Sequence, residues 1–200
     1  MTDWTKLTEN LTARGYAVKR FPTKEEAAAY LDGVLDGKTI GIGGSLTVEQ
    51  MGLYDLLRTH NTVHWHWGAN SDPQAREKAA AAQVYLTSVN GLAETGELIN
   101  IDGTGNRVAS TMYGHEAVYF LVGVNKIAPT QEEALWRARN IASPKNAQRL
   151  KKKTPCAVKG DRCYDCNSPD RICNIFATFT RKPKGIAHAE VVLVEEELGY

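Results

Sequence analysis

Four cysteines are the residues of this chain whose type and spacing point most directly to chemistry. They form the pattern C-x6-C-x2-C-x6-C in the stretch CAVKGDRCYDCNSPDRIC and are Cys156, Cys163, Cys166 and Cys173. Four thiolates complete either a tetrahedral zinc site or the four corners of a 4Fe-4S cluster. Gly160 and Pro169 favour the chain reversals that would bring the outer cysteines toward the inner pair. The sequence therefore predicts a metal site on this segment.

The choice of metal depends on details of the spacing. Structural zinc sites often pair two C-x2-C turns, and this chain has only one such turn. The longer outer gaps occur in iron–sulfur proteins, although the proline that follows the last cysteine in many ferredoxins is Asn174 here. These features favour a 4Fe-4S cluster, with zinc as the alternative. A regulated disulfide and unligated thiols are the remaining interpretations.

A glycine turn in GIGGSLTVEQ is the second candidate site. It lies between an apolar strand and a helix, and its candidate ligand-binding residues are Gly43, Gly44, Ser45 and Thr47. Free backbone N–H groups at such a turn favour phosphate or carboxylate, and glycine lets a ligand approach the backbone closely. The pattern matches neither the P-loop nor the dinucleotide-binding fingerprint. The alternative is that Thr47 and Gln50 form a capping box that simply starts the helix.

The segment from Ser88 to Arg107, SVNGLAETGELINIDGTGNR, concentrates polar residues and glycines directly after another apolar strand. We expect a polar loop at the carboxyl end of the sheet, where ligands of open α/β folds gather. Its candidate ligand-binding residues are Asn100, Asp102, Gly103, Thr104, Asn106 and Arg107. Arg107 would neutralise an anion, and Glu94 is the candidate acid, base or nucleophile. The alternative is a surface loop whose Asn and Asp side chains satisfy their own backbone.

The elements that must position these residues alternate along the chain. For residues 1–36 the pattern predicts a helix through Leu7 and Leu11, then a short strand. A second helix follows, which starts with a capping box at Thr23 and Glu26. Residues 37–150 alternate strand and helix, with one or two helices around Pro144 at the end. The strand AVYFLVGV is almost entirely apolar, as strands buried on both faces are. This order predicts a doubly wound α/β fold with a largely parallel sheet.

Beyond residue 150 the chain changes character. The sequence KKKTP ends the last helix, the cysteine loop follows, and the stretches NIFATFTR and IAHAEVVLVEE are separated by KPKG. That pattern predicts a terminal β-hairpin. We therefore expect a single domain over residues 1–200, with an N-terminal helix and strand segment (1–36), an α/β core (37–150), and the cysteine metal loop with the hairpin (151–200).

Composition argues against several classes of protein. A net charge of +1 and 42% hydrophobic residues indicate a globular chain, and they give no support to nucleic-acid binding. The sequence contains no run of about 18 apolar residues, the length needed to cross a membrane. Its N-terminal residues do not have the pattern of a secretory signal. These features predict a cytoplasmic protein with no nucleic-acid or membrane partner. A reducing cytoplasm favours metal-bound over disulfide-bonded cysteines.

Four stretches of the sequence resemble the LUD domain family, in particular small stand-alone members of the lactate-utilization protein C type that carry four cysteines. The stretches are GGSLT, NGLAETGELINIDGTGNRVA, VGVNKI and TPCAVKGDRCYDCNSPDRICN. The resemblance implies a fold similar to ribose-phosphate isomerases, glucosamine-phosphate deaminases and CoA-transferases. In that superfamily, turns such as Gly43 to Ser45 and acidic loops such as Asn90 to Asn106 form a pocket at the strand ends.

The same resemblance implies a role in organic-acid metabolism. LUD proteins are associated with oxidation of lactate to pyruvate alongside iron–sulfur subunits, so the implied partners are a small anionic metabolite and iron–sulfur redox subunits. The chain has no second C-x2-C-x2-C run, so it is not expected to hold two clusters. Comparison with CoA-transferases implies a nucleophilic role for Glu94. The alternative is an isomerase- or transferase-like enzyme, or a metabolite sensor, whose cysteines hold a purely structural zinc.

Overall fold

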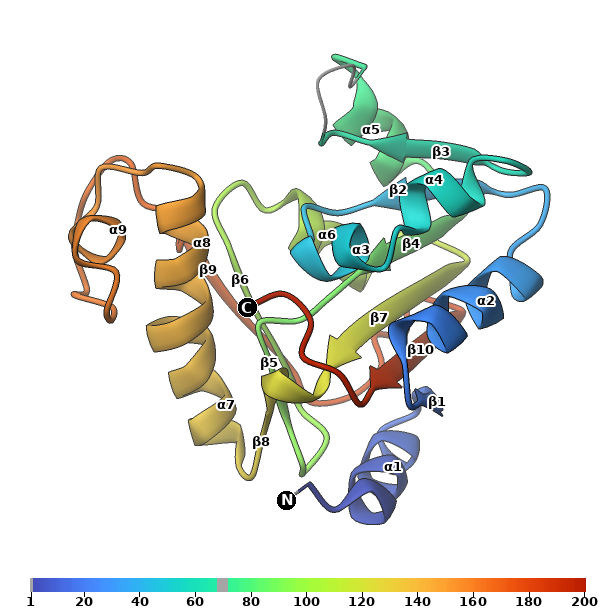
Figure 1. Ribbon diagram of the computed structural model, residues 1–200, viewed down its shortest axis with the longest axis horizontal. Helices are drawn as coiled ribbons and strands as arrows, with labels where there is room; N and C mark the ends of the chain where they lie inside the picture. The colour runs from blue at the N-terminus through green and yellow to red at the C-terminus, as the bar shows by residue number, and fades with distance from the viewer. Residues whose placement is uncertain (1, 68–71) are drawn as a thin grey trace.

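A computed structural model describes residues 2–67 and 72–200, and its centre is a six-stranded parallel sheet (Figure 1). The strand order is β1-β10-β7-β4-β2-β3, and every neighbouring pair is parallel. The strands are β1 (Ala17–Phe21), β2 (Thr39–Ile42), β3 (Thr62–Trp65), β4 (Val84–Thr87), β7 (Ala117–Gly123) and β10 (His188–Val194). Burial of β7 and β10 on both faces explains their nearly continuous apolar sequences.

Helices pack on both faces of this sheet, which confirms the predicted doubly wound α/β fold. One face carries α2 (Lys24–Val34), α3 (Leu46–Gln50) and α4 (Leu53–Leu57), whose apolar side chains pack with those of β2, β4, β7 and β10. The other face carries α1 (Trp4–Ala13), α5 (Ala75–Ala80) and a second sheet. As predicted, Thr23 caps α2, since its side chain accepts a hydrogen bond from the Glu26 N–H.

The second sheet contains four strands in the order β8-β5-β6-β9. They are β5 (Gly91–Ala93), β6 (Leu98–Asp102), β8 (Ile127–Ala128) and β9 (Ile175–Phe179). The prediction of a polar loop over Ser88 to Arg107 is therefore wrong for most of that segment. Leu92, Leu98 and Ile99 are fully buried in it, and these apolar residues between the glycines form the strand pair β5 and β6.

The predicted terminal hairpin is also wrong. Strand β9 pairs antiparallel with β6 in the second sheet, whereas β10 lies parallel between β1 and β7 in the first. The physical reason is visible in their burial: β10 is buried on both faces, while alternate residues of β9 are exposed. A strand buried on both faces belongs in the interior of a parallel sheet, where it cannot serve as half of an edge hairpin.

One long helical run covers the second sheet (Figure 1). It consists of α7 (Gln131–Arg137), a π-helical turn (Ala138–Ala142) and α8 (Ser143–Arg149), so the helix does not break at Pro144. Gly91 allows the close approach of α7 to β5, because a Cβ atom there would lie 2.4 Å from the Ala134 carbonyl oxygen. The cysteine segment follows α8 and begins with the short helix α9 (Pro155–Lys159).

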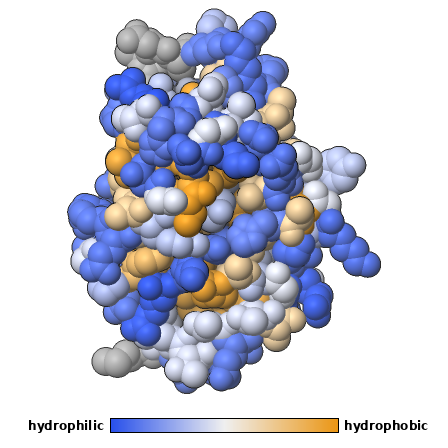
Figure 2. All heavy atoms as spheres, turned by 90° about the vertical axis from the view of Figure 1, so that its right-hand side faces the viewer, coloured by the Kyte–Doolittle hydropathy of each residue, from blue (hydrophilic) through white to orange (hydrophobic). Residues whose placement is uncertain are grey.

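The surface on the right-hand side of Figure 1 is mainly polar and charged, with apolar side chains only in small groups (Figure 2). Within residues 2–67 and 72–200, no helix has the length and apolar character needed to span a membrane.

Candidate functional site

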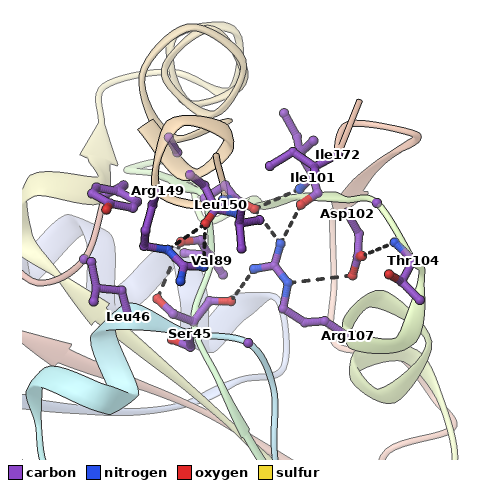
Figure 3. A pocket seen from close by; sticks show the side chains of 18 of the residues that line it. Ser45, Leu46, Val89, Ile101, Asp102, Thr104, Arg107, Arg149, Leu150 and Ile172 are labelled. Carbon is purple, nitrogen blue, oxygen red and sulfur yellow. Dashed lines mark hydrogen bonds and ion pairs between the residues drawn. The ribbon is translucent and has the colours of Figure 1, made fainter. Parts of the chain in front are cut away.

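The main candidate site is a cavity of about 340 Å³ at the carboxyl ends of the parallel strands. The loops after β2, β4 and β6 and the short turn after β7 form its walls, together with one face of α8 (Figure 3). Seven of the ligand-binding candidates named from the sequence line it: Gly44, Ser45, Asp102, Gly103, Thr104, Asn106 and Arg107. The structure thus brings together two segments that lie far apart in the sequence. A cavity of this size fits a small metabolite.

Three other ligand-binding candidates lie behind the cavity wall. Gly43 packs close to Tyr85, since a Cβ atom there would lie 2.9 Å from the Tyr85 hydroxyl. Asn100 is buried and accepts a hydrogen bond from Arg107 at 3.0 Å. Thr47 is buried and does not start the helix, because Ser45 is the N-cap of α3 and accepts from the Val48 N–H. The capping-box interpretation of Thr47 and Gln50 is therefore wrong.

Glu94 lies apart from the residues that line the cavity. It follows β5, where its backbone N–H donates to the Ala128 carbonyl at 2.8 Å. Its own carbonyl accepts from the Asn10 side chain at 2.7 Å. These contacts anchor the turn between β5 and β6, and the catalytic role of Glu94 stays a prediction.

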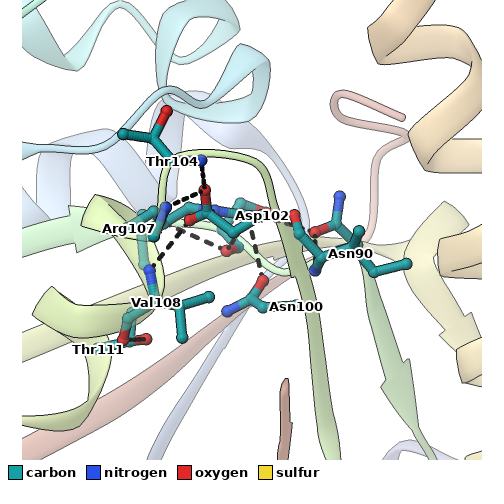
Figure 4. A network of polar contacts seen from close by, with 11 residues as sticks. Asn90, Asn100, Asp102, Thr104, Arg107, Val108 and Thr111 are labelled. Carbon is teal, nitrogen blue, oxygen red and sulfur yellow. Dashed lines mark hydrogen bonds and ion pairs between the residues drawn. The ribbon is translucent and has the colours of Figure 1, made fainter. Parts of the chain in front are cut away.

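Arg107 and Asp102 form the core of a polar network beside the cavity (Figure 4). The Arg107 guanidinium donates to Asn90 Oδ1 at 2.7 Å, to the Ile101 carbonyl at 2.6 Å, to Asn100 Oδ1 at 3.0 Å and to the Ser88 carbonyl at 3.3 Å. Its Nε lies 3.8 Å from Asp102 Oδ2. Burial lowers the pKa of Arg107, and the neighbouring Asp102 charge opposes that shift.

Asp102 in turn holds the start of α6 (Asn106–Met112). Its Oδ1 accepts from the Thr104 and Gly105 N–H groups at 3.0 and 2.9 Å, and its Oδ2 accepts from the Val108 N–H at 3.1 Å. Gly105 has φ +92°, a conformation that L side chains rarely adopt, which explains the glycine in this turn. Arg107 and Asp102 thus build the wall of the cavity, and the hydrogen-bonding groups of Arg107 are directed at the protein.

Lys126 contributes a buried amine to the same cavity. Its Nζ lies 2.7 Å from Thr47 Oγ1 and 2.8 Å from Ser88 Oγ. Burial, followed by the positive charges of Arg137 and Arg107, holds the pKa of Lys126 well below its usual value.

Other cationic side chains face the cavity from its rim. The Arg149 guanidinium lies over the Trp67 ring, 4.4 Å from its centroid, and donates to Asn146 Oδ1 at 2.8 Å. Arg76 on α5 and His66 also line the cavity. Burial, and to a smaller extent the charge of Arg76, lowers the pKa of His66. Asp102 is the one carboxylate side chain among the described lining residues, and it is engaged by backbone N–H groups.

The four cysteines line a second, much smaller cavity of about 20 Å³. Arg139 Nε donates to Cys163 Sγ at 3.4 Å, and the Asp165 N–H donates to the same sulfur at 3.3 Å. Arg171 donates to the Cys166 and Cys173 carbonyls. Burial raises the pKa of the Cys173 thiol, and Arg171 opposes that shift. Four thiols thus line one small cavity, with two guanidinium groups nearby.

The geometry of this cysteine cavity bears on what it could hold. A tetrahedral zinc site needs four donors at about 2.0–2.3 Å from one ion. In the described ranges, no three His, Cys, Asp or Glu side chains stand close enough together to hold one ion. The enclosed space is about that of a single water, which is smaller than a four-iron cluster. The thiol donor set fits either group chemically, and binding requires adjustment of residues 161–174, where no helix or strand fixes the backbone.

Comparison with known protein families shows which family the chain belongs to. The family model described as LUD domain matches residues 4–194. The chain belongs to the LUD domain family. A search of curated proteins found no significant match for this LUD domain. A crystal structure of a DUF162 family protein from Deinococcus radiodurans is similar, with a TM-score of 0.52 over 95% of this chain and 94% of that chain. At 12% sequence identity, that similarity shows a common fold alone.

The two cavities of this LUD domain are neighbours. Ile172 lines both, and α8 separates them, with Asn146 and Arg149 facing the larger cavity and Pro144 and Ala147 facing the cysteines. Asn174, the residue after Cys173, ties the cysteine segment to the wall of the larger cavity. Its backbone N–H donates to the Asp102 carbonyl at 3.0 Å, and its side chain donates to the Gly103 carbonyl at 2.9 Å.

Several residues at the larger cavity of the LUD domain escaped the sequence reasoning. They are His66, Trp67, Arg76, Lys126, Asn146 and Arg149. For Lys126 one signal was present, since VGVNKI places a lysine soon after an apolar strand, at the end of the sheet where ligands gather. Arg149 carried no such signal. A cation in the last turn of a helix is usually solvated and is explained by its favourable interaction with the helix dipole.

Proposed function

We propose that this LUD domain acts in organic-acid metabolism. It binds a small carboxylate such as lactate or pyruvate in the cavity at the strand ends. The charge of the lining residues carries the proposal. Arg76 and Arg149 bring positive charge to the cavity, while Asp102, the one carboxylate side chain among the described lining residues, is already bound by backbone N–H groups and lies beside Arg107. An anion in this cavity therefore meets the positive charges of Arg76 and Arg149.

Arg149 is the cation best placed to test the proposal. It lies at the cavity over Trp67, and it is exposed, so its replacement should leave the core intact. A hydrogen bond from a charged group contributes about 1.5–3 kcal/mol, so Arg149→Met should weaken carboxylate binding by about 10- to 100-fold. The exposed Arg162, outside the cavity, gives the matched control Arg162→Met.

Titration calorimetry with pyruvate, lactate and their neutral amides measures this directly. The expected result is binding of the acids, little binding of the amides, and loss of affinity in Arg149→Met alone. The proposal is abandoned if neither acid binds, or if the amides bind as tightly as the acids.

We also propose that Cys156, Cys163, Cys166 and Cys173 hold a 4Fe-4S cluster. The proposal rests on the placement of all four cysteines along one cavity and on the guanidinium groups of Arg139 and Arg171, which would offset the negative charge of the thiolates. Such a cluster, when bound, supplies one-electron transfer. The protein would then work with iron–sulfur redox subunits in the oxidation of an organic acid.

Protein purified without oxygen should then be brown and absorb broadly near 400 nm, as thiolate-to-iron charge transfer requires. Cys163→Ser should lose most of that absorbance, whereas Asn167→Ala, an exposed change in the same loop, should retain it. Iron and sulfide analysis gives the stoichiometry.

A second candidate function is an isomerase- or transferase-like enzyme, or a metabolite sensor, with a structural zinc. The small volume of the cysteine cavity favours it, because one ion needs far less space than a cluster. A colourless protein with one zinc per chain would support this candidate and contradict the cluster.

A further inference from the structure

The hydrogen bonds around Lys126 determine what its amine is able to do. Thr47 Oγ1 donates to the Leu198 carbonyl at 3.3 Å, and Ser88 Oγ donates to the Leu121 carbonyl at 2.6 Å. A hydroxyl has one proton, so each of these oxygens must accept when it meets the amine. Lys126 Nζ therefore donates to both, at 2.7 and 2.8 Å.

Two donated hydrogen bonds match an uncharged amine. A neutral amine has two N–H groups and one lone pair, so both N–H groups are used and the lone pair stays available. A charged ammonium would carry a third N–H. No carboxylate lies within 4.0 Å of Lys126 in the described part of the chain, and Arg107 and Arg137 add positive charge nearby.

The position of Lys126 places this amine within reach of a ligand in the cavity. The side chain is 4% exposed, yet it lines the cavity that carries the cationic rim. A buried, uncharged lysine beside a substrate cavity is the arrangement in which lysine acts as a nucleophile toward carbonyl carbon. The surrounding cations suit a substrate that carries a carboxylate next to that carbonyl.

We propose that Lys126 is a nucleophile that forms an imine with the carbonyl carbon of a 2-oxo acid bound in the cavity. The inference rests on the proposed function, since it needs a carboxylate in the same cavity. The Nζ lone pair attacks the carbonyl carbon, and a C–N bond forms. The two amine protons pass to the carbonyl oxygen, which leaves as water, and a C=N bond remains. No oxidant or reductant is consumed.

Reductive trapping tests the imine. Full-length protein is incubated with pyruvate and then with sodium borohydride, whose hydride converts C=N into a stable secondary amine. Intact mass spectrometry should show a gain equal to one reduced pyruvate, and peptide mapping of the unaltered protein should place it on Lys126. Lactate, which has a hydroxyl in place of the keto group, should give no adduct. Since mapping uses the native sequence, it does not depend on whether a variant folds.

A variant pair adds a second measurement. Lys126→Met should reduce the adduct to the level seen without pyruvate, whereas Lys145→Met, at an exposed lysine of α8 outside the cavity, should keep it. Adducts spread evenly over surface lysines would overturn the inference. Pyruvate that binds by calorimetry without trapping at Lys126 would overturn it and leave the proposed carboxylate site standing. If neither binding nor an adduct is seen, both proposals fail.

Discussion

Arg107→Met tests whether Arg107 builds the cavity wall or binds the ligand. In the structure its guanidinium donates to four acceptors, contributed by Ser88, Asn90, Asn100 and Ile101, and lies 3.8 Å from Asp102. Methionine fills similar space but leaves those acceptors and the Asp102 charge without their cation. Removal of one partner from a buried ion pair costs about 3–5 kcal/mol. For a chain of this length, that corresponds to a fall in Tm of roughly 6–20 °C.

Urea denaturation followed by tryptophan fluorescence measures the change in the free energy of unfolding. The matched control is Arg149→Met, because Arg149 lies at the same cavity but on its exposed rim. We expect Arg149→Met to change stability by less than about 1 kcal/mol. A loss below about 1 kcal/mol in Arg107→Met, with carboxylate affinity reduced as strongly as in Arg149→Met, would refute the reasoning. Arg107 would then be the free anion ligand that its sequence position predicts.

Two further predictions concern packing and pH. Gly41→Ala should lower the free energy of unfolding by at least about 1–3 kcal/mol, because its Cβ would lie 2.3 Å from the Ala79 carbonyl oxygen. Gly33→Ala, in open space on α2, should raise it by roughly 0.5–1 kcal/mol, and urea unfolding compares the two. Burial lowers the pKa of His115, so the unfolded state binds the proton first, and stability falls as pH drops below about 6.5. His115→Phe should reduce this loss of stability between pH 7.5 and 5.5. A variant that loses as much stability over this range as the unaltered protein would contradict the prediction.

Much of the fold follows from local sequence. Strands such as β7 carry enough consecutive apolar residues to indicate burial on both faces, and the helices between them have clear starts, such as the Thr23 cap of α2. The place of the cavity follows as well, because loops at the carboxyl ends of parallel strands meet at one edge. For this reason the sequence alone assigns the glycine turn at Gly44 and the segment at Asp102 to one site, and both line the cavity.

The errors have a common physical cause, which is pairing between distant segments. Strand β9 has the spacing of a hairpin partner for β10, but it pairs antiparallel with β6 instead and leaves alternate side chains exposed. Strands β5 and β6 contain glycine and polar residues that suggest a loop, and their partners β8 and β9 come later in the chain. The burial of Lys126 depends on the same long-range packing, because Thr47 on α3 and Ser88 after β4 both accept hydrogen bonds from its amine.

The shared wall between the cavities links the cysteines to the proposed carboxylate site. A cluster larger than the present space would displace residues 161–174, and Ile172 in that segment also lines the larger cavity. Asn174 extends the link, since its hydrogen bonds to the Asp102 and Gly103 carbonyls attach the segment to the wall that Arg107 supports. Any change in carboxylate affinity caused by metal must be matched by an equal change in metal affinity caused by carboxylate. The cysteine segment and the carboxylate site are therefore expected to behave as one thermodynamic unit.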